Sequence, residues 1–159
     1  MATVKSIVYR PVDEPEGGST VGYLRRSLDT ALLIEGYGIQ GDHKGGNPQR
    51  NLNVMDEATQ AELKGEGYPT GAGKLGENII LAGIDLRTLP DGTRLRLGSQ
   101  AIIVLDKRRN GCQQLTQLDA RMPDSVQGRI GWMCRVVKSG SIKVGDPVEV
   151  LVETQTPAG

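Results

Sequence analysis

The 159-residue sequence predicts a mainly β fold, a mostly antiparallel β-barrel with a few short peripheral helices. Short segments rich in branched residues alternate with glycine- and proline-containing turns, which is typical of strands joined by tight connections. Helical spacing is confined to two brief segments, and strands and helices do not alternate regularly, so a parallel sheet is not indicated. At this length we expect one domain over residues 1–152 and a frayed C-terminal tail over 153–159.

The first half of the chain supplies expected strands at Thr3–Tyr9, Leu28–Glu35, Asn51–Met55 and Glu77–Leu81. In the first of these strands, strict alternation places Val4 and Ile7 on opposite faces. Asp56 is positioned to cap a mostly solvated helix that covers Glu57–Lys64 and ends at Gly65.

The second half supplies expected strands at Thr93–Leu97, Gln100–Asp106, Gly131–Lys138 and Val148–Val152, with hairpins at Gly98-Ser99 and at Ser139-Gly140. Leu115 and Leu118 have helical spacing, which favours a short helix over Cys112–Leu118. Cys134 shares a strand face with Trp132 and Val136, so we expect it to pack in the core as a small apolar residue.

Composition excludes several classes of function. The 19 basic and 19 acidic residues cancel, so no overall field draws the protein to nucleic acid or membrane. The sequence has no Phe and one Trp, too few aromatics for stacking on single-stranded nucleic acid. Two cysteines do not make a disulfide scaffold, and no apolar run is long enough for a signal peptide or a membrane span, so a reducing cytoplasmic setting is expected.

The chemically most distinctive stretch is Lys107-Arg108-Arg109-Asn110-Gly111-Cys112, in which three consecutive cations precede a thiol. Nearby positive charge favours the thiolate, which is the form that attacks electrophiles, carries sulfur and binds metal. A helix that begins at Cys112 would lower the thiol pKa further. The alternative interpretation is a basic surface loop that happens to contain a cysteine.

Two other residues are candidates for chemistry. His43, the only histidine, lies in a glycine-rich loop after Asp42, where a hydrogen bond to an anionic ligand is better supported than a metal site, because the ligand spacings of structural zinc are missing. Glu77 is the nearest candidate acid or base, although a carboxylate at a strand start is more typically solvated.

Five segments in order resemble one known family: Gly38-Ile39-Gln40-Gly41-Asp42-His43, Leu75-Gly76-Glu77-Asn78-Ile79, Leu89-Pro90-Asp91-Gly92, Arg109-Asn110-Gly111-Cys112 and Gly145-Asp146-Pro147-Val148. That family is the MOSC domain found at the C-terminus of molybdenum cofactor sulfurases. The resemblance runs from about Val4 to Val150. One departure is Gly111, which stands where the family usually has proline and gives the chain before Cys112 more backbone freedom.

The resemblance implies a small β-barrel whose Cys112 carries sulfur as a persulfide or ligates molybdenum in a pterin-bound cofactor. Lys107, Arg108 and Arg109 would then hold a pterin phosphate or stabilise the thiolate. His43, Arg50 and Asn78 would be secondary polar contacts. The protein would act as a sulfurtransferase or as a molybdenum-cofactor-dependent oxidoreductase.

The resemblance also implies partners. Since the chain has no desulfurase domain, pyridoxal phosphate would act only through a partner cysteine desulfurase, and a molybdenum-cofactor enzyme is the other expected partner. Two further classes stay open, because fold does not fix function. One is a catalytically silent module that binds an anion or cofactor through the same basic residues, and the other is a barrel that serves only as a structural domain.

Overall fold

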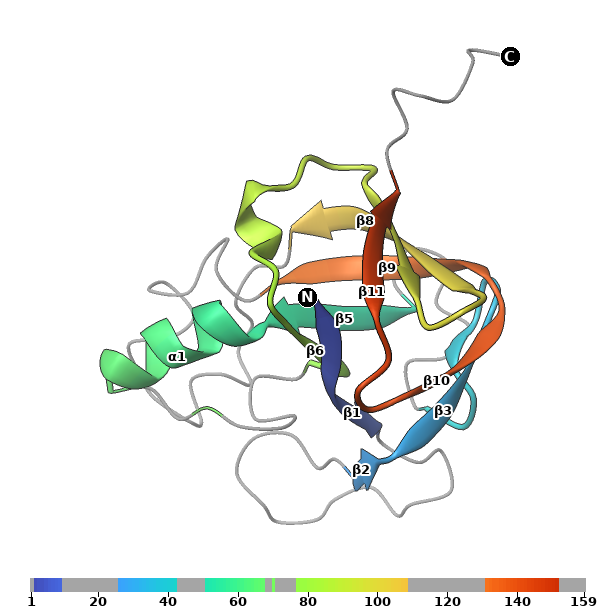
Figure 1. Ribbon diagram of the computed structural model, residues 1–159, viewed down its shortest axis with the longest axis horizontal. Coiled ribbons are helices and arrows are strands. Elements are labelled where there is room, and N and C mark those ends of the chain that lie inside the picture. The colour runs from blue at the N-terminus through green and yellow to red at the C-terminus, as the bar shows by residue number, and fades with distance from the viewer. Residues whose placement is uncertain are drawn as a thin grey trace.

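The computed structural model describes residues 2–9, 26–42, 51–67, 70, 77–108 and 131–151, and this part of the chain is mainly β (Figure 1). An eight-stranded sheet has the order β11-β7-β8-β9-β5-β6-β1-β2, and a three-stranded sheet has the order β10-β3-β4. The elements are β1 (Thr3–Tyr9), β2 (Arg26–Leu28), β3 (Thr30–Ile34), β4 (Gly38–Ile39), β5 (Leu52–Asp56), α1 (Glu57–Gly65), β6 (Ile79–Ala82), the 3-10 helix η1 (Leu86–Thr88), β7 (Arg94–Leu97), β8 (Ala101–Arg108), β9 (Trp132–Lys138), β10 (Gly140–Lys143) and β11 (Val148–Leu151).

Strand pairing is mostly antiparallel, as predicted. Among the described strands only β5 and β6 pair in parallel. The outer strands β2 and β11 do not pair with each other, so closure into a barrel is not found within the described ranges. The start of β1 nevertheless reaches the turn before β11, because Val4 N–H donates to the Asp146 carbonyl at 2.9 Å and accepts from Gly145 N–H at 2.8 Å through its own carbonyl.

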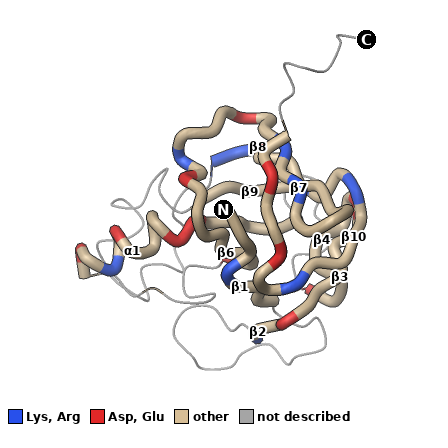
Figure 2. Tube along the Cα trace, in the orientation of Figure 1, with Lys and Arg blue, Asp and Glu red and all other residues tan. Residues whose placement is uncertain are grey.

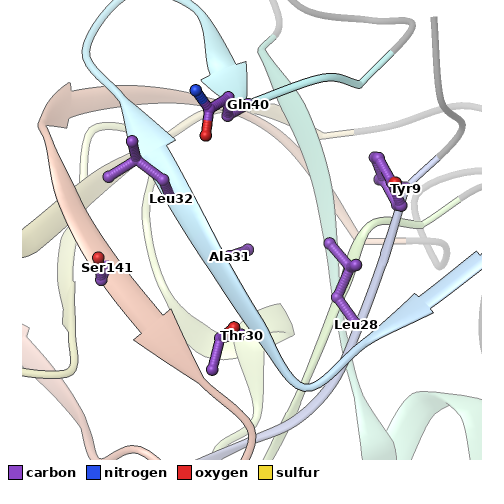
Figure 3. Close-up of a pocket in the computed structure, with 7 residues that line it drawn as sticks. All are labelled: Tyr9, Leu28, Thr30, Ala31, Leu32, Gln40 and Ser141. Carbon is purple, nitrogen blue, oxygen red and sulfur yellow. The ribbon is translucent and has the colours of Figure 1, made fainter. Parts of the chain in front are cut away.

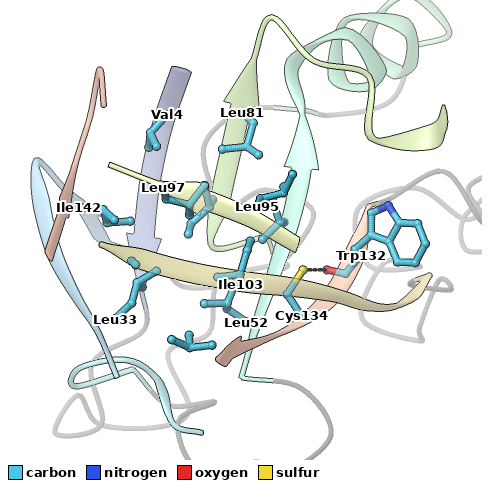
Figure 4. Close-up of a cluster of buried hydrophobic side chains, with 14 of the residues drawn as sticks. Val4, Leu33, Leu52, Leu81, Leu95, Leu97, Ile103, Trp132, Cys134 and Ile142 are labelled. Carbon is cyan, nitrogen blue, oxygen red and sulfur yellow. Dashed lines mark hydrogen bonds between the residues drawn. The ribbon is translucent and has the colours of Figure 1, made fainter. Parts of the chain in front are cut away.

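The buried apolar side chains form one core between the sheets (Figure 4). The prediction that Val4 and Ile7 face opposite sides of β1 is wrong, because both are 1% exposed and belong to this core. The register of β1 against β6 shifts between Val4 and Ser6. This bulge leaves Lys5 as the extra, exposed residue and turns both apolar side chains inward.

Two predicted connections differ in the structure. The strand expected over Leu28–Glu35 is broken at Asp29, and its halves β2 and β3 belong to different sheets. The hairpin expected at Ser139-Gly140 does not form, because β10 pairs with β3 instead of β9. The chain therefore changes sheets at both places, which alternation within a segment cannot reveal.

The helix predicted over Glu57–Lys64 is present as α1, and it begins at Glu57 as expected. Asp56 caps α1 by accepting a hydrogen bond from Thr59 N–H through Oδ1 at 3.0 Å. One face of the helix is less solvated than expected, since Thr59, Gln60 and Leu63 are buried. In the part of the chain that the structure describes, no helix is long and apolar enough to cross a membrane.

Candidate basic strand end and buried amide network

The structure describes three of the predicted site residues, Lys107, Arg108 and Asn78. The others, His43, Arg50, Arg109 and Cys112, lie outside the described residues, as does the helix expected over Cys112–Leu118. The described site residues fall into two regions. We call Lys107 and Arg108 the basic strand end, and we call the hydrogen-bonded side chains around Asn78 the buried amide network.

The basic strand end is part of β8, whereas the sequence predicted a loop after Asp106. β8 continues through Lys107 and Arg108 because they pair with Met133 and Trp132 of β9. Figure 2 shows basic residues in blue along β8. A register shift between Leu105 and Lys107 accommodates the extra residue Asp106. The end of β8 and the start of α1 lie on one side of the molecule, and β3 and β10 lie on the other (Figure 1).

The two cations of the basic strand end differ in their surroundings. Lys107 is exposed, and Arg108 is half-buried. The guanidinium carbon of Arg108 lies 4.5 Å from the centroid of the Trp132 ring. Its Nη2 donates to the carbonyl oxygens of Arg87 at 3.0 Å and Leu89 at 3.3 Å. Arg108 is therefore bound within the fold, and of these two cations Lys107 is the one that an anion in solvent can reach.

Trp132 links the basic strand end to η1. Its ring is 1% exposed, and its Nε1–H donates to the Leu86 carbonyl at 3.0 Å. Leu86 N–H in turn donates to Oδ2 of Asp56 at 2.7 Å. Asp56 thus serves two elements, since its other oxygen caps α1. The sequence predicted that Asp56 caps α1, but it gave no sign of the bond from Leu86 N–H to Asp56.

Salt bridges hold η1 from its solvent side. Arg87 contacts Asp85 at 2.9 Å and Glu62 of α1 at 2.7 Å. The side-chain hydrogen bond from Arg87 lowers the pKa of Asp85 below its usual value. These pairs are more than one-third exposed, so they add little to stability, but they join η1 to α1.

Asn78 is the centre of the buried amide network and is fully buried. Its Oδ1 accepts from Asn53 N–H at 2.9 Å, and its Nδ2 donates to the Val8 carbonyl at 3.2 Å and to Asp42 Oδ2 at 3.4 Å. One side chain thereby joins β1, β5 and the residue that precedes His43. These contacts are internal to the fold, and a ligand contact from Asn78 stays a prediction.

Asn51 belongs to the same kind of arrangement, and the sequence did not single it out. Its side chain is buried, with Oδ1 accepting from Val136 N–H at 2.9 Å and Nδ2 donating to the Gly36 carbonyl at 3.4 Å. Asn51 therefore joins β9 to the turn before β4. The signal that the sequence offered was a polar residue next to an apolar strand. It could not identify the partners of Asn51, because Gly36 and Val136 lie far away in sequence.

Glu77 is buried, so the expectation that it is solvated is wrong. Its exposure is 0%, and its Oε2 accepts from Gln60 Nε2 of α1 at 2.9 Å. Asp42, at 1% exposure, is also buried. Carboxylates in such positions need hydrogen-bond donors to offset the loss of hydration, and here amide groups provide them.

Cys134 packs in the core as predicted (Figure 4). The residue is 0% exposed, and its Sγ lies 3.8 Å from the Trp132 carbonyl oxygen as a weak donor. Burial, with a smaller contribution from the negative charge of Asp106, raises the pKa of this thiol far above its usual value. Cys134 is thus held as the neutral, unreactive thiol.

A metal cluster is not found in the described residues. They contain no group of three His, Cys, Asp or Glu side chains placed to hold a metal ion. A hollow of about 360 Å³ lies beside β3 (Figure 3). Its described lining consists of Tyr9, Leu28, Thr30, Ala31, Leu32, Gln40 and Ser141. Those side chains are uncharged, so the hollow is a poor match for a phosphate-bearing cofactor.

Comparisons with known proteins agree with this fold. The family model of the MOSC domain matches residues 40–149. The crystal structure of YiiM from Geobacillus stearothermophilus is similar with a TM-score of 0.74 and 19% identity, over 98% of this chain and 78% of that chain. YuaD from Bacillus subtilis has a TM-score of 0.72 and 21% identity, over 94% of this chain and 96% of that chain.

A third similar structure is YiiM from Escherichia coli, with a TM-score of 0.66 and 22% identity, over 96% of this chain and 70% of that chain. At these identities the solved structures establish the fold alone. Comparison of the sequence with curated proteins finds no match.

Proposed function

This chain belongs to the MOSC domain family, which is associated with the molybdenum cofactor and its sulfuration, and we propose that it carries sulfur or binds that cofactor through Cys112. The observation that carries the proposal is the extent of the family match. It covers residues 40–149 and so includes both Cys112 and the three cations that precede it. A reducing cytoplasmic setting is part of this proposal, because the reaction requires a free thiol.

The choice of thiol is supported by elimination within the sequence. The chain has two cysteines, and Cys134 is fully buried with a strongly raised pKa. A buried neutral thiol can neither reach a partner's persulfide nor ligate a metal as a thiolate. Cys112 follows Arg109 by three positions and Lys107 by five, so nearby cations would favour its thiolate.

As a sulfur carrier, the protein would receive sulfur from a separate cysteine desulfurase that uses pyridoxal phosphate. The Cys112 thiolate would attack the outer sulfur of the donor's cysteine persulfide. A new S–S bond forms on Cys112, the donor's S–S bond breaks, and the donor cysteine leaves as a thiolate. Lys107 and Arg109 would stabilise the negative charge on both the thiolate and the persulfide.

The described residues fit a pterin cofactor in part. Lys107 is an exposed cation that could hold a phosphate, whereas Arg108 already donates to two backbone carbonyls. In the metal-ligand form of the proposal, Cys112 would hold molybdenum, with Lys107 and Arg109 at the phosphate and His43, Arg50 and Asn78 as secondary contacts. A bound molybdenum centre would supply two-electron redox chemistry to a partner molybdenum-cofactor enzyme or to a substrate.

We also interpret the fold as a barrel that is nearly closed. The support is the hydrogen bonding between the start of β1 and the turn before β11, which joins residues from near the two ends of the eight-stranded sheet order. A barrel of this kind would be a rigid scaffold for the segment that leaves β8.

Sulfur transfer tests the proposed function. The protein is incubated with a desulfurase, pyridoxal phosphate and free cysteine, and intact mass with peptide mapping locates any sulfur adduct. We expect an adduct of one sulfur atom on Cys112 that reductant removes and that Cys112→Ala lacks. Copurification of stoichiometric molybdenum and pterin without an adduct would select the metal-ligand form. The absence of adduct, molybdenum and pterin would reject both forms.

A further inference from the structure

Residues 109–130, which include Cys112, lie between two described side chains that both contact η1 or the residue after it. Arg108 comes immediately before this segment, and Trp132 follows it after the single residue Gly131. Arg108 donates to the carbonyls of Arg87 and Leu89, and Trp132 donates to the carbonyl of Leu86. The two boundaries of the segment are therefore fastened to one short stretch of backbone.

The contacts of Arg108 depend on the shape of its guanidinium group. The same Nη2 lies 3.0 Å from one carbonyl oxygen and 3.3 Å from the other, while the guanidinium carbon is 4.5 Å from the Trp132 ring centroid. A planar group can stack on a ring and donate at its edge at the same time. A lysine ammonium has the same charge but cannot reproduce this geometry.

The other boundary is held just as closely. Gly131 has a φ of +87°, and a Cβ at this position would overlap the carbonyl oxygen of Val54. Trp132 is 1% exposed, and the carbonyl to which it donates belongs to Leu86, whose own N–H is bonded to Asp56. Asp56 also caps α1, so the contact is anchored in a regular element.

We propose that Arg108 is a positioning residue, which with Trp132 clamps both boundaries of the Cys112-containing segment onto η1. Arg108 acts through its geometry and not through its charge, so it does not belong with Lys107 and Arg109 among the groups that meet a ligand. The consequence for Cys112 rests on the proposed function, in which the thiolate depends on where the segment holds it. The clamp itself does not rest on that function.

The test compares Arg108→Lys with Arg96→Lys. Arg96 of β7 forms an ion pair with Glu149 of β11, a pairing that lysine can preserve. A third variant, Trp132→Phe, keeps a ring below Arg108 but removes the donor to Leu86. All three preserve net charge, and far-ultraviolet circular dichroism with thermal unfolding checks that each is folded.

Two readouts are used. Trp132 is the only tryptophan, so its emission and its quenching by acrylamide report on the clamp directly. Brief alkylation of Cys112 across a range of pH gives its rate and its apparent pKa. We expect Arg108→Lys to increase quenching of Trp132, to raise the apparent thiol pKa and to slow alkylation at pH 7 by roughly three- to tenfold.

The remaining variants complete the comparison. Trp132→Phe should slow alkylation to a similar degree. The double variant with Arg108→Lys should be no slower than either single variant, and Arg96→Lys should match the wild type.

If Arg108→Lys keeps wild-type quenching and alkylation, a positive charge at position 108 is sufficient and the inference is wrong. If Arg108→Lys does not fold, wild-type alkylation in Trp132→Phe overturns the inference and slowed alkylation supports it. If wild-type protein accepts no sulfur and no cofactor while these responses appear, the clamp stands and the proposed function fails.

Discussion

The buried amide network and the basic strand end contain the same kinds of groups that sequence patterns assign to binding sites, yet their surroundings differ. Asn78 is fully buried and bonds to a main-chain N–H, a main-chain carbonyl and a carboxylate. Lys107, at the end of β8, is exposed, and its neighbour Arg108 is bound to backbone carbonyls. Polar residues next to one another in sequence thus divide into those that build the fold and those that meet solvent.

This difference determines which variants should affect stability and which should affect binding. A buried amide that loses its partner leaves another polar group unsatisfied, at a cost of about 1–3 kcal/mol for each group. An exposed cation contributes little to stability, but its charge acts on ligands at short range.

The largest expected effect is the loss of stability in Asn78→Ala. This change leaves Asn53 N–H and the Val8 carbonyl without their bonds from Asn78, so the free energy of unfolding should fall by about 2–4 kcal/mol. Chemical denaturation measures the loss. If stability is unchanged and phosphate or cofactor binding is lost, Asn78 contributes to ligand binding and not to the stability of the fold.

Cys134→Ser should have the next largest effect on stability. The substitution puts a hydroxyl in an apolar position beside Trp132 and Val136, at a cost of about 1–3 kcal/mol. Cys134→Ala is the matched control, because it removes the sulfur without adding a polar atom. Thermal unfolding of the two variants gives the difference, and sulfur acceptance by Cys112 should be kept in both. Lost acceptance with an unaltered unfolding temperature would contradict the core assignment.

Lys107→Gln should change binding and leave stability within about 0.5 kcal/mol of wild type. Titration with inorganic phosphate at low and high salt should show affinity weaker by roughly fivefold or less at low salt, with a flatter salt dependence. Lys138→Gln is the control, since Lys138 is also exposed. Lys107 pairs with Met133 near the start of β9, whereas Lys138 is the last residue of that strand. Equal affinities in the two variants would show that Lys107 is only a solvated surface charge.

Asp85→Asn should give the smallest of these effects, a slight loss of stability that depends on pH. The pKa of Asp85 is lowered in the folded protein, so its stabilising contribution is present above the usual carboxyl pKa and is lost as pH falls through the lowered value. The variant should therefore unfold slightly below the wild type at neutral pH, and the gap should close in acid. Asp85 is 39% exposed, which keeps this gap small. A gap that widens in acid would contradict the assigned direction.

The sequence predicted the features that depend on local patterns. Strand β1 was placed at its observed bounds, Asp56 was identified as the cap of α1, and Cys134 was assigned to the core. Each of these depends on residues within a few positions, where periodicity and capping preferences act.

Features that depend on distant partners were missed. The bulge at Lys5 requires knowledge of the register against β6, and the path of β10 requires knowledge that β3 is its neighbour. The extension of β8 through Arg108 depends on pairing with Trp132, and the second bond of Asp56 depends on η1. Of the three consecutive predicted cations the structure describes two, and the difference between the bound Arg108 and the exposed Lys107 follows from those same pairings.

The account most depends on the difference between the two thiols, which brief alkylation of the native protein followed by peptide mapping measures directly. Cys134 is fully buried and its pKa is strongly raised, so it should stay unlabelled while the protein remains folded. Cys112 should be labelled much faster, and denaturation should make the two rates similar. Equal labelling in the native state, or preference for Cys134, would contradict the assignment of Cys112 as the reactive thiol.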